Sequence, residues 1–340
     1  MPFSTIDSPK KYFDTSLYTG TGSSQSISNL NFQPDFTWIK GRSGATDHAL
    51  YDAVRGVQKD LVSNATSAET TQTTGLTAFG STGFTIGALA KLNTSSATYC
   101  SWNWLGANTT VSNTAGTITS TVSANTTSGF SIVSYTSQSS GSATIGHGLG
   151  AVPKIIICKI KDQSDNWRMY HSSLGNTGFM ILNLSNAFST NSTTWNNTSP
   201  TSTVFTLGTQ WAASYNMITY CFAEVKGYSK IGSYTGNGST DGTFIYTGFK
   251  PSFIMFKRSD AVQDWYMYDN KRNTYNPENL QLDAMDVGAE STLLSGDFVS
   301  NGFKFRSLSS AFNTSGGTYI YMAFAENPFT SSKGIPCTAR

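Results

Sequence analysis

The sequence predicts an all-β protein built from three tandem repeated β-sandwich units, jelly-roll-like, with few short helices. Three observations predict this class. A nineteen-residue segment occurs three times, short alternating patterns typical of strands flank each copy, and the 3.6-residue periodicity of long helices is scarce.

The repeated segment covers residues 34–52, 153–171 and 251–269, which align without a gap. The copies share proline, lysine and tyrosine at constant offsets of 119 and 98 residues, namely Pro34, Pro153 and Pro251, Lys40, Lys159 and Lys257, and Tyr51, Tyr170 and Tyr268. A register kept over this length indicates three copies of one structural unit.

Each copy has the pattern of two strands joined by a polar turn. In the third copy, residues 253–256 are apolar at every position, which predicts a strand covered on both faces. Residues 259–263 are polar, and residues 265–268 are aromatic-rich, as expected of a returning strand. Because the three lysines mark a repeated scaffold, we expect them to have a structural role.

Further strands are expected on both sides of each hairpin. The upstream strands are residues 16–20, 132–136 and 231–236, followed by 26–32, 142–149 and 242–249. The downstream strands are residues 83–87, 204–208 and 302–305, followed by closing aromatic strands at 99–104, 217–224 and 319–326. This strand number suits a sandwich of about 100 residues. Short helices are expected at residues 53–55 and 277–280.

Composition shifts place the boundaries at residues 1–110 for the first sandwich, 111–226 for a linker plus the second, 227–329 for the third, and 330–340 for a C-terminal tail. Residues 106–128 are almost all small and polar, which indicates a linker or an exposed strand pair. Residues 226–230 leave almost no slack, so the second and third units are expected to pack rigidly.

Composition and charge exclude several classes of function. Only 12 % of the 340 residues are charged and the formal net charge is +2, without a Lys/Arg cluster, so nucleic-acid binding is not expected. No apolar run reaches about 18 residues, so no membrane insertion is expected. The first residues show no secretory signal. A 13 % aromatic content supplies a core and argues against disorder.

The sequence offers little chemistry, and we expect no enzymatic activity, no cofactor and no metal. The four cysteines show no CxxC pairing, although a Cys158–Cys221 bridge stays open. His48 and His171 occupy positions where the other copies carry Trp or Asp, which indicates packing positions. His147 lies in a glycine-rich turn that proline and a strand follow, unlike a dinucleotide loop. The pairs Asp162/Asp165 and Asp260/Asp264 leave glycoside hydrolysis or a calcium ion as alternatives.

Aromatic residues in polar loops provide the remaining functional signal, because exposed rings stack on sugar faces. Trp167 and Trp265 recur in the scaffold and are expected in the core, and Trp211 also lies beside a polar loop. Trp195 and Tyr275 lie in the variable segment and are the candidate surface contacts.

The ordered motifs GFKPSFIMFKR, DWYMYD, FVSNGFKF and GGTYIYMAFAENPF resemble a family of repeat-built, tail-fibre-like proteins of tailed bacteriophages, frequent in marine phages and containing a domain of unknown function. FQPDFTWIK, LYDAVRG and FGSTGFTIG in the first copy resemble the same family, so the likeness covers nearly the whole chain. The resemblance implies a virion protein and implies no catalytic residue.

The resulting hypothesis is a virion structural protein, a tail-fibre or appendage component that attaches to a receptor or glycan on the host surface. It would be assembled in the host cytoplasm and released by lysis. Other virion proteins are expected partners, and a homotrimer is expected because appendages are symmetric homo-oligomers. The alternatives are a head-decorating or tail-assembly subunit without a receptor role, and a polysaccharide depolymerase.

Overall fold

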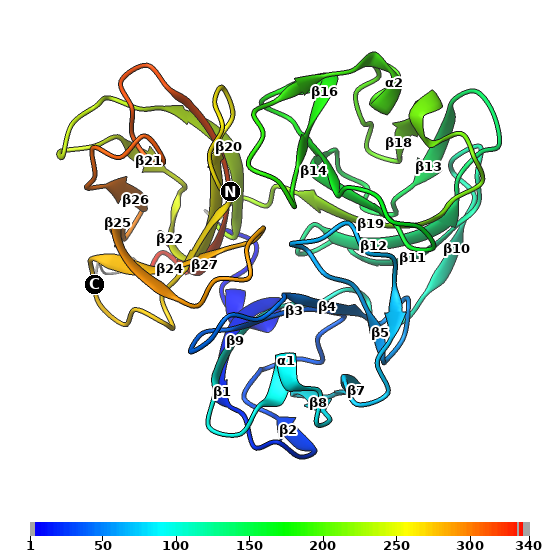
Figure 1. Ribbon diagram of the computed structural model, residues 1–340. Helices are drawn as coiled ribbons and strands as arrows, with labels where there is room; N and C mark the ends of the chain where they lie inside the picture. Colours follow the sequence, from blue (N-terminus) through cyan, green and yellow to red (C-terminus); the bar gives the residue numbers. More distant parts are fainter. Residues whose placement is uncertain (1–3, 332, 336–340) are drawn as a thin grey trace.

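The computed structural model describes residues 4–331 and 333–335 and shows three lobes around a common centre (Figure 1). We call them unit 1 (residues 13–104), unit 2 (residues 130–223) and unit 3 (residues 229–328). Each unit is a sandwich of two antiparallel sheets, one facing the centre and one facing outward. The prediction of an all-β fold with sandwich units and few helices is confirmed.

The inner sheet has the same strand order in every unit: first strand, last strand, then the two strands of the repeated hairpin. These strands are β1 (Phe13–Thr19), β9 (Thr98–Trp104), β3 (Phe36–Gly41) and β4 (Ala49–Asp52) in unit 1; β12 (Phe130–Thr136), β19 (Asn216–Ala223), β14 (Pro153–Ile160) and β15 (Arg168–His171) in unit 2; and β20 (Ser229–Thr235), β27 (Thr318–Pro328), β22 (Phe249–Arg258) and β23 (Tyr266–Asp269) in unit 3. Because the first strand pairs with the last, each unit closes on itself.

Strand register shows that the copies occupy equivalent places. Across the hairpin strand and the last strand, Phe36 lies opposite Trp104, Ile155 opposite Phe222, and Phe253 opposite Phe324. Residues 36, 155 and 253 are related by the same offsets of 119 and 98 as the repeated segments. Equivalent residues can therefore be compared between units.

The outer sheets are smaller and differ among the units. Their strands are β2 (Gln25–Ile27), β8 (Gly83–Ile86) and β7 (Leu76–Gly80) in unit 1, with the separate pair β5 (Lys59–Asp60) and β6 (Thr70–Thr71); β13 (Ala143–Gly146) and β18 (Val204–Leu207) in unit 2, where β16 (Gly175–Ile181) and β17 (Ser189–Thr190) extend the inner sheet; and β21 (Phe244–Tyr246), β26 (Gly302–Phe305), β25 (Ser291–Val299) and β24 (Glu278–Asp283) in unit 3. In unit 3, β24 also pairs with β23, so its two sheets are continuous.

The polar stretch before unit 2 was expected to be either a linker or a strand pair. It forms a strand pair, β10 (Val111–Asn113) and β11 (Ser120–Asn125). Because β11 pairs with β12, this segment extends the inner sheet of unit 2. The described helices are short: α1 (Ala90–Asn93), α2 (Ser192–Trp195), and the 3-10 helices η1 (Pro9–Lys11) and η2 (Thr209–Trp211).

The prediction of short helices at residues 53–55 and 277–280 is wrong. Residues 53–55 form a turn, in which Asp52 Oδ1 accepts a hydrogen bond from the Arg55 backbone at 2.8 Å. Residues 278–283 form β24, held between β23 and β25. At the first place the Ala53 N–H also donates to the distant Asp35 carbonyl at 2.8 Å, so in both places hydrogen bonds to distant segments override the weak local helix preference.

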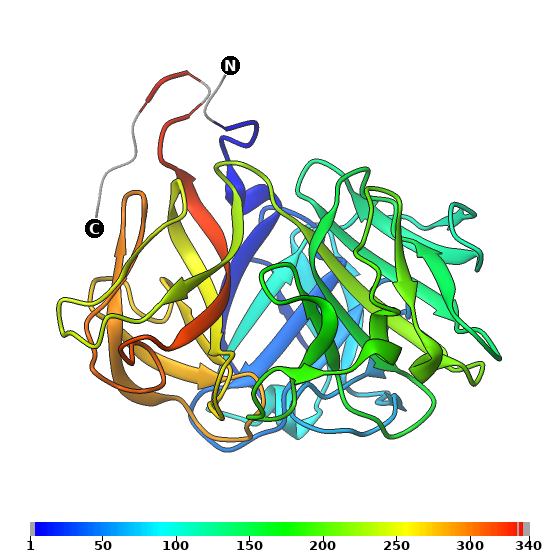
Figure 2. The ribbon, with the colours of Figure 1, turned by 90° about the horizontal axis from the view of Figure 1, so that it is seen from above.

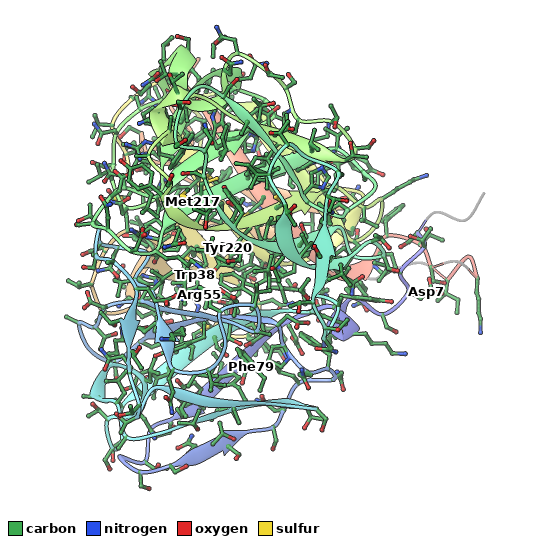
Figure 3. All side chains as sticks on the ribbon, turned by 90° about the vertical axis from the view of Figure 1, so that its right-hand side faces the viewer. Asp7, Trp38, Arg55, Phe79, Met217 and Tyr220 are labelled. Carbon is green, nitrogen blue, oxygen red and sulfur yellow. The ribbon has the colours of Figure 1, made fainter. Side chains whose placement is uncertain are left out.

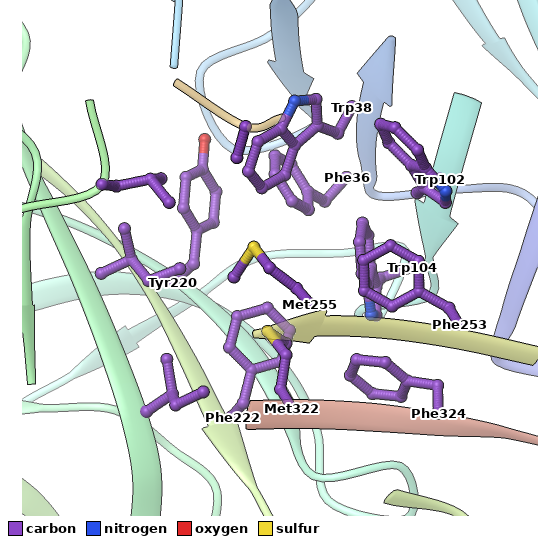
Figure 4. Close-up of a cluster of buried hydrophobic side chains, with 14 of the residues drawn as sticks. Phe36, Trp38, Trp102, Trp104, Tyr220, Phe222, Phe253, Met255, Met322 and Phe324 are labelled. Atoms are coloured by element: carbon purple, nitrogen blue, oxygen red, sulfur yellow. The ribbon is translucent and has the colours of Figure 1, made fainter. Parts of the chain in front are cut away.

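The inner sheets are buried on both faces, which explains their continuous apolar runs. In β22, Ile254 and Phe256 pack in the sandwich core of unit 3, while Phe253 and Met255 face the centre of the molecule. The three units share this central core, whose members include Phe36, Trp38, Trp102, Trp104, Ile157, Tyr220, Phe222, Phe253, Met255, Met322 and Phe324 (Figure 4). Figure 2 shows the ribbon from above, with unit 1 (blue to cyan) between unit 3 (yellow to red) on the left and unit 2 (green) on the right.

Candidate binding surface

Buried ion pairs are the first groups that resemble a reactive site, and they join the units. Asp52 and Arg55 form a buried pair in unit 1, and Asp52 Oδ2 accepts a hydrogen bond from the Tyr220 hydroxyl of unit 2 at 2.7 Å. Figure 3 shows Arg55, Trp38 and Tyr220 together at this boundary. Since Asp52 and Tyr220 are fully buried, this cluster has no access for a substrate.

The equivalent position makes a contact of the same kind at the other two boundaries. In unit 3, Asp269 pairs with Arg272 and accepts a hydrogen bond from Trp102 Nε1 of unit 1 at 3.1 Å. In unit 2 the position is His171, whose Nε2 lies 3.3 Å from the Tyr321 carbonyl oxygen of unit 3. Each unit is therefore linked to the next through the end of its repeated hairpin.

The shared lysines link the units as well. Lys40 Nζ donates to the Val287 carbonyl at 2.9 Å, Lys159 Nζ to the Thr66 carbonyl at 3.1 Å, and Lys257 Nζ to the Ser185 carbonyl at 2.7 Å, each in a neighbouring unit. Burial lowers the pKa of each lysine to about 8. This geometry agrees with the structural role expected from the repeat.

The position shared by His48, Trp167 and Trp265 also faces a neighbouring unit. Trp167 Nε1 donates to the Val62 carbonyl at 2.9 Å, and Trp265 Nε1 donates to the Ile181 carbonyl at 2.8 Å, while His48 Nε2 lies 2.9 Å from the Asp283 carbonyl oxygen. His48, His147 and His171 are all buried. The exchange of His for Trp therefore preserves a packing contact.

Replacing His171 by asparagine is expected to reduce the loss of stability in acid. Burial lowers the pKa of His171 to about 4, so between pH 6.5 and pH 4 the unfolded chain binds a proton that the folded protein does not. The free energy of unfolding therefore decreases as the pH is lowered from 6.5 to 4, and His171 accounts for about 3 kcal/mol of this loss at pH 4. Urea unfolding at pH 7.5 and pH 4.5 measures the effect. Equal losses in wild type and His171→Asn would contradict the assignment.

The centre of the molecule is too tightly packed for a ligand. The void between the units measures about 10 Å³ and is lined by Phe36, Trp38, Leu50, Trp104, Ile157, Trp167, Leu182, Tyr220, Phe222, Phe253, Met255 and Met322. A single water molecule needs about 10–15 Å³ together with polar partners. The central core is therefore a structural core.

Three of the four aspartates considered for hydrolysis or calcium binding are engaged in local contacts. Asp165 pairs with Arg168, Asp260 with Arg258, and Asp162 Oδ2 accepts from the Asn216 amide at 2.8 Å. No cluster of three or more His, Cys, Asp or Glu side chains in the described part of the chain is arranged to hold a metal ion. Cys100, Cys158 and Cys221 are free and buried.

Trp195 is not a surface contact, so that prediction is wrong. The side chain is 2 % exposed and packs between Tyr170 and Trp211, and its Nε1 donates to the Gly178 carbonyl at 3.0 Å. Helix α2 turns the indole inward, although the loop around it is polar. Trp167, Trp211 and Trp265 are buried too.

Tyr275, the other candidate, is 78 % exposed. It belongs to unit 3, next to Asn276, which exchanges two hydrogen bonds with the backbone of Phe298 in β25. This anchor holds the loop of Tyr275 beside the outer sheet of unit 3. Nothing in the local sequence required an exposed ring at this place.

Strand β21 adds two exposed rings to the same sheet. Phe244 is 45 % exposed and Tyr246 is 54 % exposed, while Ile245 between them points into the sandwich core. A Cβ on Gly302, which lies opposite Tyr246, would meet the Phe244 ring at 3.0 Å, so this ring lies across the glycine. The sequence analysis missed both residues, although the alternating pattern of residues 244–246 is a signal for outward-facing rings.

Charged side chains surround these rings. Lys304 lies opposite Phe244 and pairs with the exposed Asp241, and Arg306, which follows β26, pairs with Asp297 of β25. We call the exposed rings Phe244, Tyr246 and Tyr275 with Lys304 the unit 3 surface. It can supply stacking faces together with hydrogen-bond donors and acceptors.

A second hollow lies between unit 1 and the segment before unit 2. It has a volume of about 290 Å³ and is lined by Asp35, Ala53, Asn108, Thr109, Thr110 and Ser123. Burial raises the pKa of Asp35 to about 6, and its Oδ2 accepts hydrogen bonds from the backbone of Gly106 and Asn108 at 2.7 and 3.1 Å. This carboxyl therefore positions the loop that follows β9.

The fold and the contacts define an all-β scaffold whose buried polar clusters join three units and whose exposed aromatic rings, among the described residues, lie on unit 3. The chain belongs to the family described as a domain of unknown function, DUF7483, which it matches over residues 8–328. A search of curated proteins finds no match. None of the helices in the described residues has the length and apolar character that a membrane crossing requires.

Proposed function

We propose that the protein is a structural subunit of a bacteriophage virion, in a tail fibre or related appendage, and that it attaches the particle to a glycan or protein on the host surface. The observation that carries the proposal is the unit 3 surface, where three aromatic rings are exposed on one unit. The equivalents of Phe244 are Ser26 in unit 1 and Thr144 in unit 2, which have no ring. Exposed aromatic side chains supply large contact areas at binding surfaces.

A further observation supports the virion assignment. The motifs of the first and third repeats resemble those of tail-fibre-like phage proteins, and this likeness covers nearly the whole chain. The homotrimer and the contacts with other virion proteins stay predictions.

The alternatives differ in their support. A head-decorating or tail-assembly subunit would use the same exposed rings to bind another virion protein. A depolymerase needs two available carboxylates about 5–10 Å apart, and at least one member of each pair considered from sequence is engaged in an ion pair or a hydrogen bond. The depolymerase alternative therefore receives no support from these residues.

Purified protein is expected to block adsorption of its phage to host cells. The triple variant Phe244→Ser, Tyr246→Ser and Tyr275→Ser is expected to block about tenfold less well, because such rings dominate contact energies. The control Val111→Ser with Val152→Ser removes exposed aliphatic side chains elsewhere. If the wild-type protein leaves phage adsorption unchanged, the attachment role is overturned. If the protein releases reducing ends from host glycan, its function is glycan hydrolysis instead.

A further inference from the structure

We propose that the free edge of β21 binds an extended polypeptide segment of a protein partner as an added β-strand. This inference rests on the proposed attachment function, because it takes from it that unit 3 faces a partner. It names both the chemical class of the partner and the atoms that bind it.

The backbone of β21 presents unused hydrogen-bonding groups at this edge. β21 is the last strand of its sheet and pairs only with β26. Phe305 N donates to the Thr243 carbonyl at 3.2 Å and Thr247 N to the Asn301 carbonyl at 3.0 Å, so the odd-numbered residues face β26. The N–H and C=O groups of Phe244 and Tyr246 therefore point away from the sheet. Within the described residues, neither backbone makes a hydrogen bond on that side.

Unit 2 shows what covers the equivalent edge. Its strand β13 is bordered by residues 117–120 of the segment that precedes the unit, and Ile118 forms a parallel bridge with Ile145. Ile118 N donates to the Thr144 carbonyl at 3.1 Å, and Ser120 Oγ donates to the Gly146 carbonyl at 2.8 Å. The chain thus adds its own extended segment to this edge.

Register places the covered and uncovered edges at the same position. Ile145 lies opposite Phe205 in unit 2, and Ile245 lies opposite Phe303 in unit 3. Thr144 and Gly146 therefore correspond to Phe244 and Tyr246. No segment among the described residues covers this edge of unit 3, and only residues 224–228 connect β19 to β20.

The exposed rings distinguish unit 3 from unit 1. The corresponding edge of β2 carries Ser26 and Ser28, whose small hydroxyl side chains are readily hydrated. Phe244 and Tyr246 instead expose about half of each ring to solvent. An added strand would satisfy the backbone groups and cover the apolar rings at the same time.

The geometry favours a polypeptide over other occupants. A row of alternating N–H and C=O groups is complementary to an extended backbone, whereas a glycan would use the faces of the rings. A second copy related by a two-fold axis would place β21 antiparallel to β21, while the covered edge of unit 2 has a parallel neighbour. The expected segment is rich in β-branched and hydroxyl residues and low in charge, like residues 117–120.

The test uses a labelled peptide with the sequence NTAGTITSTV, residues 113–122 of the chain, added to the full-length protein. We expect saturable binding that slows hydrogen exchange of the Phe244 and Tyr246 amides. Phe244→Pro removes one outward N–H without removing a β21–β26 bond, and it is expected to weaken binding about tenfold. Ser26→Pro is the matched control, because it makes the same change in unit 1 and should leave binding unchanged.

A second variant, Phe244→Ser with Tyr246→Ser, copies Ser26 and Ser28 of unit 1, whose edge has no added strand among the described residues, and serves if the proline variant does not fold. It should also weaken binding, because it removes the rings. The proposal is overturned if the peptide does not bind, or if it slows hydrogen exchange only at amides other than those of Phe244 and Tyr246. It is also overturned if the protein alone forms a dimer in which the Phe244 and Tyr246 amides are protected from exchange. If the peptide does not bind but the protein still blocks phage adsorption, the attachment function stands and only the added-strand proposal is overturned. If the peptide binds but the protein does not block adsorption, only the attachment function is overturned.

Discussion

Replacing Arg272 by leucine is expected to lower the free energy of unfolding by about 3–5 kcal/mol, the usual cost of removing one partner of a buried ion pair. Arg272 and Asp269 side chains are both fully buried, and Arg272 also donates to the Met267 carbonyl at 2.9 Å. The variant leaves the carboxylate of Asp269 at the boundary with unit 1 without its cation. Urea unfolding at pH 7.5 measures the loss.

Unit 2 provides the matched control. At the positions of Asp269 and Arg272 it carries His171 and Leu174, 98 residues earlier in the chain. The double variant Asp269→His with Arg272→Leu is therefore expected to recover part of the lost stability, because no unpaired charge stays buried. A single variant as stable as wild type, or a double variant less stable than the single one, would contradict the role of this pair.

Trp104→Ala is expected to lower the free energy of unfolding by about 3–5 kcal/mol, the range for removing a large buried aromatic side chain. The indole packs against rings from all three units, including Phe36, Phe222 and Phe253. Because these rings fill one core, the variant should destabilise the three units together. Circular dichroism and tryptophan fluorescence should then report the same urea midpoint.

The control is Trp104→Phe. Its equivalents in the other units are Phe222 and Phe324, and the Trp104 Nε1 atom has no hydrogen-bond partner within the described structure. We expect this variant to lose less than about 1.5 kcal/mol, because a ring still fills most of the space. Two separate unfolding transitions in Trp104→Ala would show that the units are independent.

Much of the fold could be predicted because the repeat is encoded in local patterns. The apolar run at residues 253–256 predicted a strand covered on both faces, and β22 is buried between the core of unit 3 and the central core. The offsets of 119 and 98 predicted equivalent hairpins, and the strand register of Phe36, Ile155 and Phe253 agrees with them.

The candidate site was less predictable, because exposure depends on which segments meet. Tyr275 and Trp195 both lie in polar, variable loops, yet α2 buries Trp195 against Trp211 while Tyr275 stays in solvent. The pattern at residues 244–246 indicated which rings point outward from a strand. It carried no information on whether another segment would cover them.

The sequence by itself determined that the chain is all-β, that one sandwich motif recurs three times, and which side chains share a face of each strand. These properties follow from local alternation and from repetition along the chain. Only the tertiary structure decided that the units surround one apolar core, that Lys40, Lys159 and Lys257 bind carbonyls of neighbouring units, and that no segment in the described part of the chain covers the β21 edge. The physical reason is that these features arise from contacts between residues distant in the chain, where burial and hydrogen bonding depend on the whole assembly of strands.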